Sequence, residues 1–206
     1  MHKRRIRYAV LAATVAFSTP VIAQSVPAFT QADVHFMQGM IGHHAQALAM
    51  VALIPARTNR PDLHALGERI RVSQQDEIAL MKQWLRDRDQ EIPSIDMSHD
   101  HAMPGHEMRM PGMATSDTLM PGMLTPEQMT ELADAKGADF EILFLRDMIQ
   151  HHEGALTMVA RLLGTTGSGQ EPEVFRFAAE VDTDQRAEIA RMKALLSSLQ
   201  PTPTTR

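Results

Sequence analysis

Apolar residues recur in two stretches of the chain at the spacing of an amphipathic α-helix, and each stretch contains a pair of histidines. Met40 to Val51 reads Met-Ile-Gly-His-His-Ala-Gln-Ala-Leu-Ala-Met-Val, and Met148 to Val159 reads Met-Ile-Gln-His-His-Glu-Gly-Ala-Leu-Thr-Met-Val. Residues at i, i+3, i+4 and i+7 share one face of a helix. The chain therefore contains one helical unit twice. The histidines on its apolar face are His43, His44, His151 and His152.

A second amphipathic helix follows each histidine helix, and it is repeated as well. Gln74 and Glu77 interrupt its apolar face in the first copy, and Gln185 and Glu188 do so in the second. No stretch shows the period-two alternation of a strand. We expect an all-α protein in which two duplicated helix hairpins pack as a four-helix bundle. The alternative is two tethered hairpins that each complete a bundle in a dimer.

Capping residues and prolines place the helices of the first hairpin. Thr30 begins a helix that runs to about residue 54, where Pro55 stops it. Pro61 then opens a second helix, which runs to about residue 89 and ends before Pro93.

The second hairpin has similar signals. Thr125 with Gln128 at N3 predicts a short helix that ends at Gly137. Asp139 is expected to cap the long histidine helix, and the last helix spans residues 172–199.

These signals divide the chain into five segments. We expect a signal peptide at 1–23, a first helix hairpin at 24–93, a Met/His-rich linker at 94–124, a second hairpin at 125–199 and a tail at 200–206.

The first residues have the pattern of an export signal. A basic segment containing Arg4 and Arg5 precedes a short apolar run, Tyr8 to Phe17, and Ala23 suits cleavage. No segment reaches the roughly 20 apolar residues of a membrane-spanning helix. We expect a soluble, periplasmic or secreted protein without membrane insertion.

Charge and cysteine content narrow the chemistry. Removing the four basic residues of the signal leaves 16 Lys and Arg against 25 Asp and Glu, a formal charge of −9. Such a chain is a poor candidate for binding nucleic acid. It contains no cysteine, so a metal ion would be bound by His, Met and carboxylates.

The linker gathers side chains that bind soft metal ions. It contains Met-Pro-Gly three times, and a Pro-Gly turn would bring Met120 and Met123, or Met110 and Met113, together. Thioethers are soft ligands for Cu(I), and imidazole accepts either oxidation state of copper, with silver as a mimic. The candidate copper ligands in the linker are His99, His101, Met103, His106, Met108, Met110, Met113, Met120 and Met123.

The helices offer a second candidate copper site. Met40 precedes His43 and His44 by about one turn, and Met148 precedes His151 and His152 in the same way. Glu77, Glu188 and the neighbouring glutamines would orient the imidazoles from outside the ligand set. The alternative is a buried polar layer, in which the same hydrogen bonds only fix the helix register.

Two other functions compete with copper binding. A Met-rich linker could dock on an apolar partner protein while the histidines are structural. A di-iron or other redox enzyme would need four carboxylates and two Glu-x-x-His pairs, whereas the repeated faces offer only Glu77 and Glu188. We therefore expect a metal-binding protein without enzymatic activity.

The chain resembles the exported family called domain of unknown function 305. The resemblance rests on Phe144, Met148, His151, His152, Ala155 and Met158, on their repeat at Phe36, Met40, His43, His44, Ala47 and Met50, and on residues 121–125. It implies a ferritin-like bundle that binds copper through Met and His in the cell envelope and contributes to copper tolerance. A copper buffer or carrier, which exchanges the ion with another envelope metal carrier, is the function that we expect.

Overall fold

The computed structural model describes residues 29–94 and 119–199, and all of the regular elements in these residues are α-helices. The described part of the chain is therefore all-α, as predicted. None of the described helices is long and apolar enough to cross a membrane. The predicted signal peptide, residues 95–118 of the linker and the tail lie outside the described residues. The helices are α1 (Gln31–Ala52), α2 (Ile54–Arg57), α3 (Pro61–Arg86), α4 (Pro126–Asp134), α5 (Gly137–Gly164) and α6 (Pro172–Leu199).

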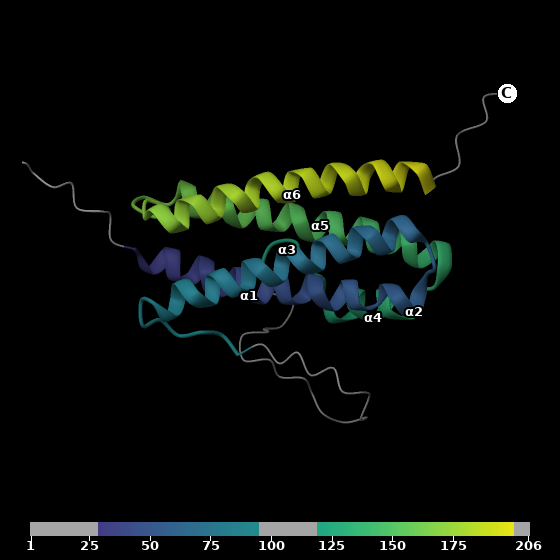
Figure 1. Cartoon of the computed structure of the whole chain (residues 1–206), viewed down its shortest axis with the longest axis horizontal. Helices are drawn as coiled ribbons and strands as arrows, with labels where there is room; N and C mark the ends of the chain where they lie inside the picture. Colours follow the sequence, from purple (N-terminus) through teal and green to yellow (C-terminus); the bar gives the residue numbers. More distant parts are fainter. Residues whose placement is uncertain (1–28, 95–118, 200–206) are drawn as a thin grey trace, which may run out of the picture.

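The long helices form two hairpins that pack against each other within one chain. Helix α1 packs along α3, α5 packs along α6, and α1 lies against α5 (Figure 1). The start of α1 lies beside the turn after α5, where Gly169 N donates to Asp33 Oδ1 over 2.7 Å, so α1 and α5 are antiparallel. The alternative of separate, tethered hairpins is not what the structure shows.

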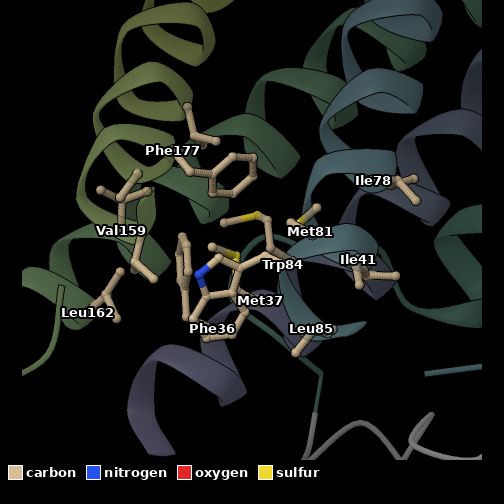
Figure 2. Close-up of a cluster of buried hydrophobic side chains, with 14 of the residues drawn as sticks. Phe36, Met37, Ile41, Ile78, Met81, Trp84, Leu85, Val159, Leu162 and Phe177 are labelled. Atoms are coloured by element: carbon tan, nitrogen blue, oxygen red, sulfur yellow. The ribbon is translucent and has the colours of Figure 1, made fainter. Parts of the chain in front are cut away.

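Two hydrophobic clusters fill the interior, and the histidines lie where the clusters meet. One cluster contains Phe36 of α1, Trp84 of α3 and Phe177 of α6 (Figure 2). On α1, Met40 belongs to this cluster and Ala47, one turn beyond the histidines, belongs to the other. Helix α5 has the reverse order because it runs in the opposite direction. The imidazoles therefore form a polar layer between two apolar ones.

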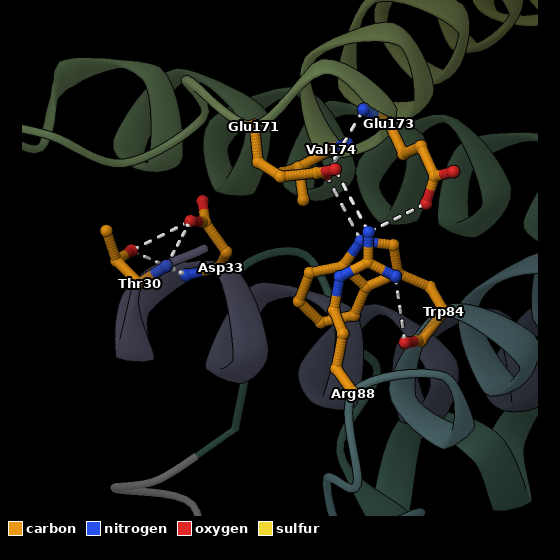
Figure 3. A network of polar contacts seen from close by, with 7 residues as sticks. All are labelled: Thr30, Asp33, Trp84, Arg88, Glu171, Glu173 and Val174. Carbon is orange, nitrogen blue, oxygen red and sulfur yellow. Dashed lines mark hydrogen bonds and ion pairs between the residues drawn. The ribbon is translucent and has the colours of Figure 1, made fainter. Parts of the chain in front are cut away.

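A polar network at one end of the bundle fixes the register of the hairpins. Arg88, just after α3, stacks on Trp84 and pairs with Glu171, which precedes α6, at 3.0 Å (Figure 3). The Glu171 carboxylate also accepts from Val174 N, over 2.9 Å, in the first turn of α6. Because Glu171 is buried, these charge-assisted bonds hold the ends of α3 and α6 together.

Both predicted N-caps, Thr30 and Thr125, are present, and each is part of a capping box. Thr30 and Asp33 exchange hydrogen bonds at the start of α1, and Thr125 and Gln128 do so at the start of α4. Each box satisfies backbone groups that a helix end leaves unpaired.

Two boundary predictions are wrong. Pro55 does not stop the first helix: α1 ends at Ala52, and Pro55 lies in the first turn of α2, where its missing N–H costs nothing. Asp139 is not the cap of α5, because the helix begins earlier, at Gly137 with Lys136 as its N-cap. Asp139 lies in the first turn, where a carboxylate favours the helix dipole.

Candidate metal centre

The four histidines of the repeat form one buried cluster. All are completely shielded from solvent. The rings of His43 from α1 and His151 from α5 lie against each other, with centroids 3.8 Å apart and planes inclined by 40°. His44 and His152 flank this pair, at 6.4 and 6.3 Å from their sequence neighbours. The packing of α1 on α5 therefore brings both copies of the motif to one place.

Glutamates from the partner helices orient the two outer rings. His44 Nε2 donates to Glu77 Oε2 of α3 over 2.5 Å, and His152 Nε2 donates to Glu188 Oε2 of α6 over 2.6 Å. The two contacts are equivalent under the repeat. The glutamines behave differently, because neither amide atom of Gln74 nor Oε1 of Gln185 has a hydrogen-bond partner, although both residues are buried.

The inner rings lack such carboxylates. His43 Nε2 donates instead to the backbone carbonyl of Pro121 over 3.0 Å, which places the ring proton on Nε2 because a carbonyl can only accept. His151 has no partner at either ring nitrogen. The two copies of the motif are therefore not identical at the centre of the cluster.

The Nδ1 atoms of the four histidines in the cluster share one feature. All four, in His43, His44, His151 and His152, are buried and have no hydrogen-bond partner. Unpaired buried polar atoms are rare, because burying them costs free energy. Histidines that bind metals commonly donate their other N–H to a carboxylate or a backbone carbonyl. His43, His44 and His152 have that arrangement, because each donates from Nε2 to a carbonyl or a carboxylate.

Burial keeps the inner rings neutral. Desolvation, together with the neighbouring His44, lowers the pKa of His43 to about 3, although the Pro121 hydrogen bond acts in the opposite direction. Desolvation and the other histidines lower the pKa of His151 well below its usual value. At neutral pH both rings therefore keep a lone pair that can bind a metal ion.

The last part of the linker covers the histidine cluster. We call residues Met120 to Leu124 the strap. Met123 N donates to Met120 O over 3.1 Å and Gly122 has a φ of 76°, so Pro121 and Gly122 form the predicted turn. The side chain of Gln46 both donates to Leu124 O and accepts from Leu124 N, over 2.9 and 2.8 Å.

Gly154 of α5 lets the strap approach the bundle. A Cβ atom at this position would overlap with the carbonyl group of Pro121. The backbone of the strap therefore lies directly on α5, and the same carbonyl oxygen accepts the proton of His43. Sequence reasoning missed the roles of Pro121, Gln46 and Gly154. The available signal was a difference between the copies, because Gln46 and Gly154 stand at equivalent positions of the repeat.

The predicted thioether ligands fall into three groups. Met40 and Met148 are completely buried, Met40 in the first hydrophobic cluster and Met148 in the second. Met120 and Met123 lie half-buried in the strap. The remaining linker candidates lie outside the described residues: His99, His101, Met103, His106, Met108, Met110 and Met113.

Carboxylates and imidazoles alone do not make a complete site in the described part of the chain. No three His, Asp or Glu side chains there are placed to bind one metal ion. A metal bound at the cluster would therefore take thioethers as well or use few ligands, which suits a soft ion better than a hard one.

Comparison with known proteins identifies the family. Residues 33–196 match the model described as Domain of unknown function (DUF305). A DUF305 fragment from Deinococcus radiodurans is 29% identical with a TM-score of 0.67, over 84% of this chain and 99% of its own. A putative secreted DUF305 protein from Streptomyces coelicolor is 27% identical with a TM-score of 0.64, over 85% and 98%.

A third solved structure is that of CopM in the Cu(II)-bound form. It is 25% identical to this chain with a TM-score of 0.59, over 82% of this chain and 97% of its own. No curated protein sequence matches the chain. Because the family model covers most of the sequence, the chain belongs to the DUF305 family.

Proposed function

We propose that this protein binds copper in the cell envelope as a buffer or carrier and not as an enzyme. The observation that supports this most strongly is the buried histidine cluster, in which four Nδ1 atoms lack partners while three Nε2 atoms donate to acceptors. A structural polar layer would pair these nitrogens, because each unpaired one destabilises the fold. A metal ion would use them.

The similarity to CopM supports copper as the ion. CopM was solved in a Cu(II)-bound form and resembles this chain over most of the length of both. The ligands available here are imidazoles and thioethers, without cysteine. Imidazole suits either oxidation state, while thioethers favour Cu(I). We propose Cu(I) as the main cargo, bound by His43, His44, His151 and His152 with Met40 and Met148, and Cu(II) as a second form.

The attachment of the linker supports its participation. Gln38 Nε2 donates to Glu91 O over 2.8 Å before residues 95–118, and Met120 lies over Gly39 after them. The chain therefore leaves and returns at one turn of α1, less than two turns before His43. We propose that the linker methionines and histidines capture copper beside the cluster. We also propose a ferritin-like four-helix bundle and export through the signal at residues 1–23.

An anaerobic Cu(I) titration against a coloured competing chelator tests this function. We expect the protein without its signal to compete for Cu(I), and a variant with Gln at His43, His44, His151 and His152 to lose the bundle sites. The matched control carries Gln at His35, which is exposed on α1. If the fourfold variant folds, as circular dichroism would show, and binds as many Cu(I) ions as the control, the histidine cluster is not a copper site.

A further inference from the structure

Met120 of the strap and Met158 of α5 share the space over Gly39 of α1. A Cβ atom at Gly39 would lie 3.1 Å from Met120 Sδ and 3.5 Å from Met158 Cε. One turn further along α1, a Cβ atom at Gly42 would lie 3.5 Å from Met120 Cε. The two glycines thus leave space on this face of α1, and two flexible thioether side chains occupy it.

The duplicated unit shows that this space is specific to one side of the bundle. In the second copy, Asp147 and Gln150 stand where the first has Gly39 and Gly42. Met50, the counterpart of Met158, is completely buried in the second hydrophobic cluster, whereas Met158 is only partly buried. Met158 therefore differs from its repeat partner in being within reach of solvent and of the strap.

This space lies close to the histidine cluster. Gly39 and His43 are four residues apart on α1, which is about 6 Å along the helix axis. The residue after Met120, Pro121, accepts the hydrogen bond from His43. An ion held by the two thioethers would thus lie next to the contact that shields the inner imidazoles.

We propose that Met120 and Met158 form a binding site for a soft monovalent metal ion, Cu(I) or Ag(I), through which the ion passes from the linker to the histidine cluster. Thioether sulfur is a soft, uncharged donor, which suits closed-shell monovalent ions. Leucine would fill the same space without donating, so it separates metal binding from packing. The passage to the histidines rests on the function proposed above.

Silver binding followed by nuclear magnetic resonance tests the site. The protein, labelled with ¹³C at the methionine methyl groups, is titrated with silver nitrate in chloride-free buffer, and each methyl signal is assigned by a Met-to-Leu variant. We expect the Met120 and Met158 signals to shift together. Met158→Leu should abolish the silver-induced shift at Met120, while Met50→Leu should leave it unchanged.

The other outcomes separate this site from the proposed function. If silver shifts only the signals of Met97, Met103, Met108, Met110 and Met113, the linker binds metal and the Met120–Met158 site is refuted. If silver shifts Met120 equally in the protein and in Met158→Leu, Met158 is a packing residue and not a ligand. If no methionine signal responds, the Met120–Met158 site is wrong, and the proposed copper function then depends on the histidine cluster alone.

Discussion

Gln46 and Gly154 stand at the same position of the two repeats and hold the same strap from opposite helices. Gln46 forms two hydrogen bonds to the backbone of Leu124, and Gly154 makes room for the carbonyl group of Pro121. The two copies of the helix thus differ at one position: Gln46 of α1 binds the strap, and Gly154 of α5 leaves room for it. The consequence is that Pro121 reaches His43, and the two halves of the histidine cluster become different.

Replacing Gly154 by Ala should displace the strap. The new methyl group would overlap with Pro121, and overpacking of this kind costs about 1 to 3 kcal/mol. Urea denaturation of the metal-free protein measures the loss. The control is Gly164→Ala, because Gly164 is also in α5 but has open space around it. If the two variants are equally stable, close packing of the strap on α5 does not contribute to the stability of the fold.

Replacing Gln46 by Leu should release the end of the strap. The backbone N–H and C=O of Leu124 would lose their partners, and each unsatisfied buried group costs about 1 to 3 kcal/mol. Hydrogen exchange at the Leu124 amide should become much faster. Gln150→Leu is the control, since Gln150 is exposed and its bond to Gly122 O is 3.5 Å long. Unchanged protection in Gln46→Leu would contradict this role.

Acid should destabilise the metal-free protein because the inner histidines are buried in the neutral form. The pKa of His43 is about 3 in the fold and near 6.5 when exposed, so the unfolded chain binds protons that the folded chain does not. Stability should therefore be full above pH 6.5 and fall as the pH drops toward 3, by about 1.4 kcal/mol per pH unit for each such ring.

Each inner histidine should contribute separately to the change of unfolding free energy with pH. In His43→Gln, one proton-linked group is removed and the amide can still donate to Pro121 O, so the slope between pH 6 and 4 should decrease. His35→Gln changes an exposed residue and should retain the slope of the parent protein. Urea denaturation at several pH values provides the measurement, and identical slopes in all three proteins would refute the assignment.

The repeat in the sequence was enough to predict the helices and two hydrogen bonds between histidine and glutamate. The apolar spacing around His44 and Glu77, and around His152 and Glu188, placed each pair on facing helices, and the structure shows both hydrogen bonds. Hydrophobic periodicity determines which face of a helix is buried, so residues repeated on buried faces meet in a predictable way. The N-caps Thr30 and Thr125 were predictable as well, because capping depends on the local sequence.

The contacts of the strap could not be predicted in this way. Pro121 reaches His43 across 78 residues through a backbone carbonyl, which has no side-chain signature. The close contact between the rings of His43 and His151 depends on the relative positions of α1 and α5, which the spacing within either helix does not determine. The exact helix boundaries could not be predicted either. Proline and aspartate are both favourable in the first turn of a helix, so Pro55 and Asp139 do not mark a helix end or an N-cap unambiguously.

The proposed function requires that the buried histidines bind copper through Nδ1. Long-range ¹H–¹⁵N correlation spectra of the histidine-labelled protein at pH 7 test it directly, because diamagnetic Cu(I) permits observation of both ring nitrogens. Without metal, we expect His43 to be protonated at Nε2 and unprotonated at Nδ1. Anaerobic addition of Cu(I) should shift Nδ1 of the bundle histidines, while the Nε2 protons held by Glu77 and Glu188 remain. If Cu(I) binds tightly and none of these ring nitrogens shifts, the histidine cluster is structural and copper is bound elsewhere.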